Sequence, residues 1–218
     1  MSNKMNDKIK LDIVSDVVCP WCIIGYKHLE AAINELGLQD RVEIEWQPFE
    51  LNPDMPEQGE ELRAHVLRKY GATRDDSEKA RANISALGAE YGFTFDYFEE
   101  MKIVNTRDAH LLLDFAHEQG LQHQLKQRLF VAFFTEHKDV SNRAILLEEA
   151  QSVGLDTAAA ALALDDTERR RHVLNQEAQW QQQGISGVPT VIFNRSSAMT
   201  GAHPQSTYKD VLRKLASQ

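Results

Sequence analysis

Alternating hydrophobic and polar residues near the N-terminus indicate a first strand. Residues Lys8 to Val18 alternate and then become continuously apolar, as in a buried β-strand. Ile23 to Leu36 carries apolar residues at helical spacing and stops before Gly37, a residue typical of helix C-termini. Val42 to Trp46 alternates strictly and predicts a second strand, which a proline-containing loop over 47–58 follows. The helical segment is long enough to connect two parallel strands.

Helical periodicity dominates the next part of the chain, residues 57–183, where β-branched runs are scarce. Leu125, Leu129 and Phe133 recur at the spacing of a buried helix face. Asp156 is suited to cap a helix, and several glycines fall at expected helix ends. The predicted helices are Glu60–Tyr70, Ser77–Tyr91, Arg107–Gln119, Leu121–His137, Arg143–Val153, Thr157–Leu164 and Glu168–Gln182.

Strand character returns near the C-terminus. Val188 to Phe193 is β-rich, residues 194–197 form a turn, and Ala198 to Thr200 make a second short strand. Two short strands joined by a tight turn predict an antiparallel hairpin. Gln205 to Leu215 then reads as a final helix.

The predicted order is therefore β-α-β, a large all-helical insertion, then β-β-α, which is an α/β fold class. We expect residues 1–56 to form the first part of the α/β domain. Residues 57–183 would form the helical insertion domain, and residues 184–218 would complete the α/β domain.

Composition and charge narrow the classes of partner. The formal net charge is −9, which argues against nucleic acid or an anionic membrane as a partner. The basic run Arg169 to Arg171 has acidic neighbours and is typical of a solvated helix face. No apolar stretch resembles a signal-peptide core or reaches transmembrane length. We therefore expect a cytoplasmic protein that binds neither nucleic acid nor membrane.

The chain contains two cysteines, Cys19 and Cys22, at the predicted junction of the first strand and helix. Two thiols three positions apart in a first helical turn can close a small disulfide ring. Backbone N–H groups at a helix start stabilise a thiolate, so we expect Cys19 to be the more exposed, acidified and nucleophilic thiol. Pro20 suits an early helical position. This pattern predicts a thiol–disulfide exchange centre.

Four segments give the chain its family resemblance. It resembles the thioredoxin fold with a helical insertion found in the DsbA family, and within it the FrnE-like branch. That branch is related to 2-hydroxychromene-2-carboxylate isomerase and kappa-class glutathione transferase. The segments are Asp16–Gly25, which contains Cys-Pro-Trp-Cys, 105–110 with Asn-Thr and Ala-His, 187–190 with Gly-Val-Pro-Thr, and 201–204 with Gly-Ala-His-Pro.

The resemblance implies roles for individual residues. Cys19 matches the attacking cysteine and Cys22 the resolving cysteine of the family. Pro189 matches a cis-proline that lies beside the dithiol, and a cis bend there would expose the backbone of Val188 to a substrate strand. The implied activity is a DsbA-like protein disulfide oxidoreductase, whose oxidising or reducing direction depends on its reduction potential.

Other residues are candidates for the walls of the site. Pro20 and Trp21 lie between the cysteines, and Trp21 stands where oxidising DsbA proteins commonly have a histidine. The resemblance places Asn105 and His110 near the active-site cleft, where His110 has either a packing or a catalytic role. Asp16 is either a turn residue or a proton acceptor for Cys22.

Three alternatives remain open on the sequence. The cysteine pair could be half of a zinc site completed by His110, His117, His123 or His137, although no second Cys-x-x-Cys exists and we expect no metal. The chain could be a glutathione-dependent isomerase or transferase for a small aromatic substrate, but those enzymes carry serine at the position of Cys19. It could also be a holdase that binds unfolded chains.

The expected partners follow from the leading hypothesis. They are proteins or small molecules that carry a thiol or a disulfide, and no cofactor is required. Glutathione fits as a redox partner, and a homodimer is left open.

Overall fold

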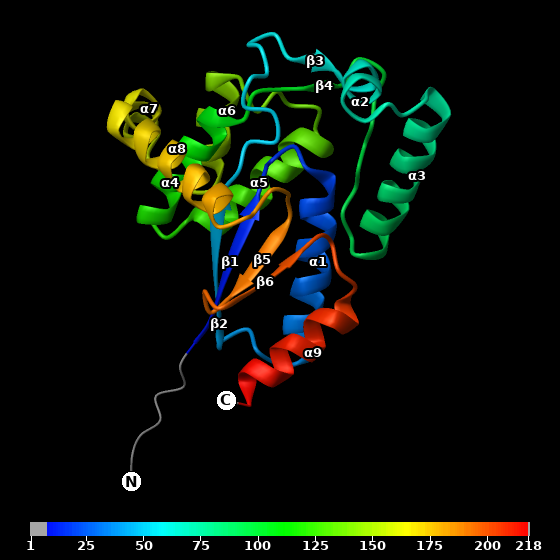
Figure 1. Cartoon of the computed structure of the whole chain (residues 1–218). Helices are drawn as coiled ribbons and strands as arrows, with labels where there is room; N and C mark the ends of the chain where they lie inside the picture. The colour runs from blue at the N-terminus through cyan, green and yellow to red at the C-terminus, as the bar shows by residue number, and fades with distance from the viewer. Residues whose placement is uncertain (1–7, 218) are drawn as a thin grey trace.

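A four-stranded mixed sheet forms the centre of the computed structural model, which describes residues 8–217 (Figure 1). The strand order is β2-β1-β5-β6, with β1 parallel to β2, β1 antiparallel to β5, and β5 antiparallel to β6. The parallel crossover and the C-terminal hairpin predicted from the sequence are both confirmed. The strands are β1 (Ile9–Ser15), β2 (Val42–Pro48), β5 (Thr190–Phe193) and β6 (Ser197–Thr200).

Helices α1 (Pro20–Glu35) and α9 (Gln205–Ala216) pack against each other beside this sheet (Figure 1). Strand residues such as Leu11 and Ile13 are fully buried and belong to the same hydrophobic cluster as residues of both helices. Because side chains alternate along a strand, Val14 belongs to a second, smaller cluster that Trp180 helps to cover. The sheet is therefore buried on both faces where β1 leads into the cysteine pair.

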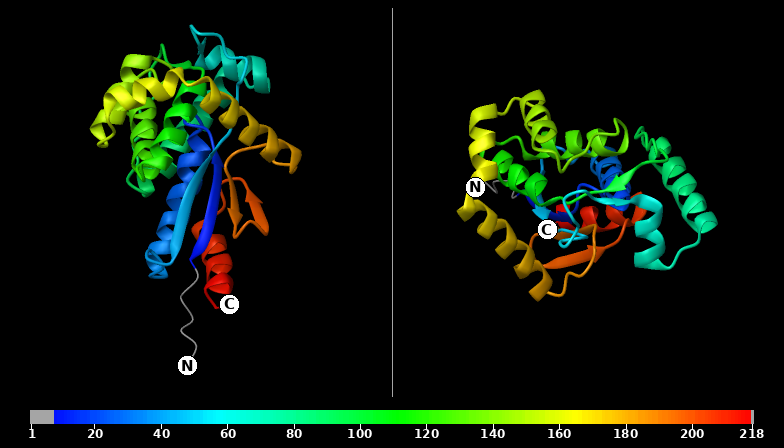
Figure 2. Two further views of the ribbon diagram at one scale, coloured as in Figure 1. Left: turned by 90° about the vertical axis from the view of Figure 1, so that its left-hand side faces the viewer. Right: turned by 90° about the horizontal axis from the view of Figure 1, so that it is seen from above.

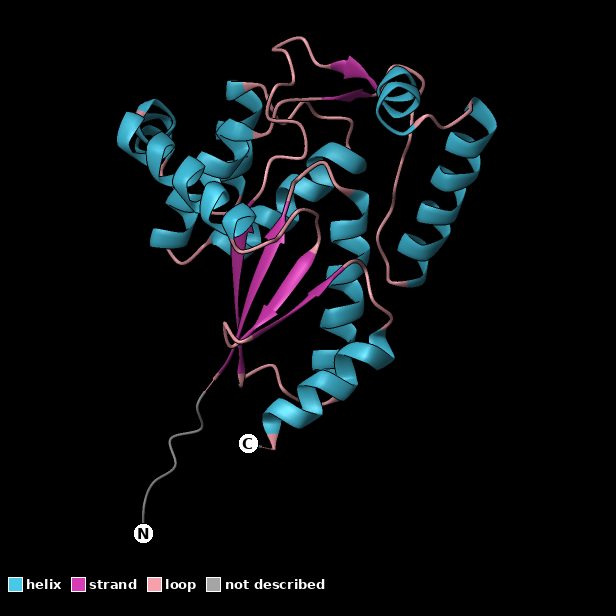
Figure 3. Cartoon of the chain, viewed as in Figure 1, coloured by secondary structure: helices cyan, strands magenta, loops and turns pink. Residues whose placement is uncertain are grey.

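The segment between β2 and β5 is mainly helical, as the sequence predicts, but it also contains long loops and the short strands β3 and β4 (Figure 3). Helices α4, α5 and α8 contact the edge strand β2, and α3 contacts α1, so the insertion surrounds the end of the sheet that carries the cysteines (Figure 2). The chain belongs to the predicted fold class, whereas the division into three domain segments stays a prediction. The elements are β3 (Glu60–Glu61), α2 (Leu62–Tyr70), α3 (Arg74–Glu90), β4 (Lys102–Ile103), α4 (Arg107–Glu118), α5 (Gln122–Phe134), α6 (Arg143–Ser152), α7 (Thr157–Asp165) and α8 (Thr167–Gln182).

Two boundaries near the cysteines differ from the sequence prediction. Strand β1 ends at Ser15, and residues 16–18 form a turn whose Asp16 carbonyl accepts the Cys19 N–H. Helix α1 begins at Pro20, three residues earlier than its apolar spacing indicated, because Cys19 takes the N-cap position. Cys19 consequently caps α1, and Cys22 lies in its first turn.

Other boundaries shift because of local hydrogen bonding. Helix α3 starts three residues early, because Thr73 and Asp76 form a capping box. Helix α5 ends at Phe134, and His137 beyond it adopts a left-handed conformation with φ of 58°. Glu60 and Glu61 pair with β4 as a short strand and are not helical. Within residues 8–217, no helix combines the length and apolarity that crossing a bilayer requires.

Candidate active site

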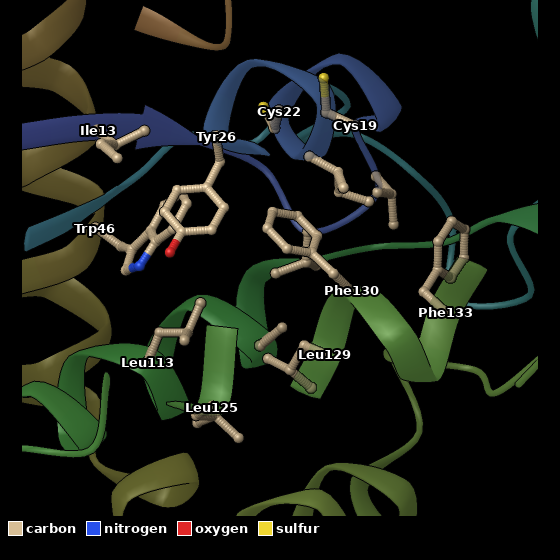
Figure 4. Packing of buried hydrophobic residues seen from close by; sticks show 14 of the residues in the cluster. Ile13, Cys19, Cys22, Tyr26, Trp46, Leu113, Leu125, Leu129, Phe130 and Phe133 are labelled. Carbon is tan, nitrogen blue, oxygen red and sulfur yellow. The ribbon is translucent and has the colours of Figure 1, made fainter. Parts of the chain in front are cut away.

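The two cysteines lie at the start of α1, above the core formed with the insertion (Figure 4). Cys19 is the N-cap residue, with extended φ and ψ of −98° and 111°, and Pro20 occupies the first turn. Both thiols are free and buried, with 4% of Cys19 and 0% of Cys22 exposed. Cys19 is thus the more accessible sulfur, as predicted, although its exposure is small.

A loop from the other end of the chain completes this site. The Val188–Pro189 peptide is cis, as the family resemblance implies, and it precedes β5, the neighbour of β1. Gly25 of α1 permits the close approach, since a Cβ there would lie 3.1 Å from Pro189 Cγ and 3.3 Å from Ala202 Cα. Within the described residues, the N–H and C=O of Val188 make no backbone hydrogen bond.

A cavity of about 390 Å³ opens beside Cys19. Helices α2 and α3 form its far wall, and its surface is mostly apolar. Trp21, a predicted wall residue, stands at its edge with 41% of its surface exposed. The cavity is lined by Val18, Cys19, Pro20, Trp21, Leu51, Asn52, Leu62, His65, Val66, Tyr70, Ser77, Ala80, Arg81, Ile84, Tyr97, Ile103 and Val188.

Asp16 organises the buried side of the dithiol. Its Oδ1 accepts hydrogen bonds from the Val17 N–H at 2.8 Å and pairs with His110 Nε2 at 3.2 Å, while Oδ2 accepts the Leu51 N–H at 2.8 Å. Burial alone would raise the pKa of Asp16, but the bond to His110 and its charge outweigh burial and hold that pKa below its usual range. Asp16 therefore stays ionised, which makes it a poor proton acceptor.

The family resemblance also placed His110 and Asn105 near the site, and the structure gives these two residues different surroundings. His110 is buried, and its Nε2 pairs with Oδ1 of Asp16, the residue three positions before Cys19. Asn105 instead serves the loop before α4: its Oδ1 accepts the Arg107 N–H at 3.0 Å and its Nδ2 donates to the Met55 carbonyl at 3.3 Å. Asn105 therefore supports the local backbone and does not reach the sulfurs.

The ionisation of the pair differs from the sequence expectation. A hydrogen bond with Cys22, followed by burial, raises the pKa of Cys19. Burial opposes ionisation of Cys22, but hydrogen bonds from Cys19 and Ser15 and the charge of Lys126 outweigh it and lower the pKa of Cys22. We expected an acidified Cys19 because backbone N–H groups at the start of a helix ordinarily lower the pKa of a thiol there. Pro20, however, has no N–H to offer, and the stabilising groups gather around Cys22.

Sequence reasoning missed two buried groups near the site. Lys126 lies on α5 with 1% of its surface exposed, and Glu177 of α8 is buried close to Glu50. The only signal for Lys126 was its place one position after Leu125 on the buried face of the helix, which ordinarily predicts an outward-facing charge. Among residues 8–217, no three metal-ligating side chains converge on one point.

A dithiol in the first turn of a helix, beside a cis-proline before an antiparallel strand, defines the thioredoxin-like class of redox proteins. The sequence also matches the family model described as DSBA-like thioredoxin domain over residues 10–213. The chain belongs to this family, which confirms the predicted fold class and DsbA relationship. Its assignment to the FrnE-like branch stays a prediction.

Individual proteins agree with this placement. The chain is 28% identical over 213 residues to the uncharacterized protein YwbO of Bacillus subtilis, covering 96% of each chain. It is similar to the structure of a probable DsbA oxidoreductase from Streptomyces coelicolor, with a TM-score of 0.90, 26% identity, and coverage of 96% of this chain and 91% of that one.

More distant structures share the fold. A 2-hydroxychromene-2-carboxylate isomerase gives a TM-score of 0.70 at 13% identity, covering 96% of this chain and 97% of that one. The cytosolic disulfide reductase DsbM of Pseudomonas aeruginosa, solved with glutathione, gives 0.65 at 17% identity, covering 96% and 100% respectively.

Proposed function

We propose that this protein is a thiol–disulfide oxidoreductase that exchanges disulfides through Cys19 and Cys22. The observation that carries the proposal is the pair of free thiols in the first turn of α1, next to the cis Val188–Pro189 peptide. Family membership supports a thiol oxidoreductase in general, and the two thiols supply the specific chemistry.

The two sulfurs have different accessibility and therefore different tasks. Cys19 borders the open cavity, so its sulfur meets the substrate, while the fully buried Cys22 can react only with Cys19. The hydrogen bond between the two thiols lets one proton pass between them, which gives Cys19 its thiolate when a substrate disulfide approaches. Attack by Cys19 forms a mixed disulfide, and Cys22 then resolves it.

The surroundings of Cys19 favour a substrate with an apolar group next to its sulfur. The adjacent cavity of about 390 Å³ is mostly apolar, so it can hold a side chain neighbouring the substrate half-cystine. The free N–H and C=O of Val188 can pair with an extended peptide. A peptide or protein disulfide uses both features, whereas a small molecule uses only the cavity.

We propose the cytoplasm as the place of action and glutathione as a redox partner that returns the dithiol to its starting state. The likeness to cytosolic DsbM, solved with glutathione, supports both points. In a compartment that reduces thiols, disulfide reduction is the favoured direction.

The Cys22→Ala variant tests this function directly. We expect it to form a stable mixed disulfide with glutathione disulfide through Cys19, seen in intact mass as one added glutathionyl group. The wild-type chain should instead become oxidised and release glutathione, because Cys22 resolves the adduct. Cys19→Ser is the matched control and should show neither product. An unmodified Cys22→Ala chain, at several pH values and with a peptide disulfide as well, would contradict the proposal.

The apolar cavity also favours a second candidate, a glutathione-dependent isomerase for a small aromatic molecule. The cavity volume of about 390 Å³ suits a single aromatic substrate beside the thiol. The structural likeness to 2-hydroxychromene-2-carboxylate isomerase makes that compound the appropriate probe. Turnover with glutathione by Cys19→Ser would favour this candidate, since an isomerase uses the thiol of glutathione.

A further inference from the structure

Among residues 8–217, no aspartate or glutamate lines the cavity beside Cys19, although the protein as a whole is acidic. The chain has 33 acidic residues against 24 lysines and arginines, and its formal net charge is −9. The basic residues of this cavity are His65 and Arg81, and the others are apolar or carry an amide, hydroxyl or thiol group. The cavity thus differs in charge from the rest of the protein, which indicates an anionic group in the substrate.

Arg81 is held at the wall of this cavity without an acidic partner. It lies on α3, where its Nε donates to the Ser77 carbonyl at 3.3 Å, and its Cζ lies 5.9 Å from the ring centroid of Tyr97. Over residues 8–217, no carboxylate oxygen lies within 4.0 Å of its guanidinium nitrogens, because Glu78, three residues earlier, pairs with Arg74 at 2.9 Å. The terminal N–H groups of Arg81 are therefore available to a ligand.

His65, the other basic residue of the cavity, already has a counter-charge. This buried side chain of α2 donates from Nδ1 to Glu60 Oε2 at 2.7 Å, since an ionised carboxylate can only accept. Glu60 also accepts hydrogen bonds from Arg68, from Nε at 2.8 Å and from the terminal nitrogen at 2.7 Å. The charges of this group are balanced among its own members. Arg81 is therefore the residue of the cavity that an anion would bind.

Arg81 and Cys19 line the same cavity of about 390 Å³, so one bound substrate can contact both. Resting on the proposed thiol–disulfide exchange, we propose that Arg81 binds a carboxylate of the substrate. The preferred substrate is a peptide disulfide with a glutamate beside its half-cystine. The apolar surface of the cavity covers the two methylene groups of that glutamate, and the guanidinium binds its carboxylate through two N–H groups. Val188 offers its backbone N–H and C=O to the peptide.

The overall charge of the protein acts against such a substrate. With a net charge of −9, long-range repulsion slows the approach of an acidic peptide. A preference for glutamate must therefore arise from a contact inside the cavity. Arg81 is suited to this contact, because an ion pair in a partly buried, apolar site is screened less than one on the surface. Its bond to Ser77 and its packing on Tyr97 also reduce the freedom lost on binding.

Three peptide disulfides test this preference. Each is a short peptide whose cysteine is joined to thiopyridine, and the residues on both sides of the cysteine are glutamate, glutamine or lysine. In the Cys22→Ala chain, the Cys19 thiolate forms a bond to the peptide sulfur, and thiopyridine leaves with the electron pair and takes a proton from water. The absorbance of free thiopyridone gives the rate. Dividing it by the rate of the same peptide with mercaptoethanol corrects for intrinsic reactivity.

We expect the corrected rate to be about 10-fold higher for the glutamate peptide than for the glutamine peptide, as for one charge-assisted contact. Arg81→Gln should remove this preference, and Arg81→Glu should reverse it in favour of the lysine peptide. Lys79→Gln is the matched control, because Lys79 is an exposed residue of α3 that does not line the cavity. It changes the net charge by the same amount as Arg81→Gln and should keep the preference.

The possible outcomes separate this inference from the proposed function. Equal corrected rates for the three peptides, or a glutamate preference that survives Arg81→Gln, would overturn the role of Arg81. Loss of the preference in Lys79→Gln would also overturn it, because the general charge of α3 would then be responsible. The peptide series itself leaves Arg81 unchanged, so it decides the matter even if an Arg81 variant fails to fold. Failure of all three peptides to form an adduct would instead overturn the proposed function.

Discussion

Two buried carboxyl groups, those of Glu50 and Glu177, make the stability of the fold sensitive to single substitutions. Glu50 Oε1 accepts a hydrogen bond from Arg107 Nε at 2.9 Å, whereas Glu50 Oε2 and Glu177 Oε1 are buried and find no hydrogen-bond partner among residues 8–217. Burial and the nearby charges of Glu50 and Asp16 raise the pKa of Glu177 to about 8. Glu177 is therefore protonated at neutral pH and can donate to Glu50, which satisfies both orphan oxygen atoms.

Glu177→Gln should make the protein more stable at alkaline pH. Between pH ~4.3 and about 8, folded Glu177 holds a proton that the unfolded chain has released, so the free energy of unfolding falls as pH rises. Glutamine removes this dependence and keeps a donor for Glu50. We compare the free energy of unfolding of Glu177→Gln with that of the wild-type chain by urea unfolding. The difference should favour the variant by about 1–3 kcal/mol more at pH 8.5 than at pH 5.

Glu43→Gln is the matched control, because Glu43 is an exposed glutamate on β2. Its substitution should change the free energy of unfolding by less than about 0.5 kcal/mol at both pH values. Equal effects of Glu177→Gln at pH 5 and pH 8.5 would show that Glu177 is ionised in the folded protein.

The sequence predicted the reactive residues themselves well, but it predicted the residues around them poorly. Cys19, Cys22 and Pro189 were recognisable from sequence because their spacing and neighbours are specific. Lys126 was not, because its burial depends on the tertiary contact of α5 with Trp46, and helical periodicity alone places a lysine in solvent. Likewise, the missing N–H of Pro20 and the groups around Cys22 decide which sulfur ionises first.

At the scale of elements, patterns predicted the existence of helices and strands and erred at their ends. Helix α1 begins at Pro20 because the chain turns at Asp16, and the apolar residues of 16–18 looked like a continuing strand. The two-residue strand β3 was missed because its pairing with β4 joins segments about forty residues apart. Local capping signals such as Asp156 were read correctly, since its side chain accepts the Ala159 N–H.

Helix α3, which forms part of the wall of the cavity beside Cys19, depends on a glycine near its C-terminal end. A Cβ at Gly88 would lie 2.6 Å from ring atoms of Phe95 and 2.9 Å from the Phe93 carbonyl oxygen. Alanine would gain about 1 kcal/mol of helix propensity over glycine. Overpacking against a buried ring costs about 1–3 kcal/mol, so the clash outweighs the gain.

Gly88→Ala should therefore lower the thermal midpoint. A net loss of up to about 2 kcal/mol is expected after the propensity gain is subtracted from the cost of overpacking, and differential scanning calorimetry measures it. Asn83→Ala in the same helix is the control, because Asn83 is exposed and its substitution changes only propensity. That control should raise stability by up to about 0.7 kcal/mol. A stabilised Gly88→Ala chain would mean that Phe95 moves aside at no cost.

At the scale of the whole molecule, the insertion and the sheet share one hydrophobic core. The largest buried cluster includes Leu11 of β1, Trp46 of β2 and Phe130 of α5. Trp46 also donates its backbone N–H to Gln122 Oε1 at 2.9 Å, and Gln122 returns a bond to the Trp46 carbonyl at 2.9 Å. This contact ties α5 to the edge of the sheet, so neither part can unfold without exposing the core of the other.

We therefore expect a single unfolding transition for the chain. Tryptophan fluorescence reports on Trp21, Trp46 and Trp180, of which Trp46 lies in the shared core, and far-ultraviolet circular dichroism reports on all helices. Their urea transitions should coincide, as they do for a cooperative unit. Two separate transitions, with helical signal persisting after the fluorescence change, would show that residues 57–183 fold as an independent domain.

The order of the elements along the chain also determines when reactivity arises during synthesis. Cys22 and Pro189 are separated by 167 residues, which a ribosome adds in roughly 10–30 s at about 5–20 residues per second. Throughout that time the nascent chain carries two ordinary thiols, because β5 and the cis peptide bond beside them have not been made. The site is thus complete only after Pro189 and β5 have been synthesised, and until then its thiols depend on the surrounding compartment to stay reduced.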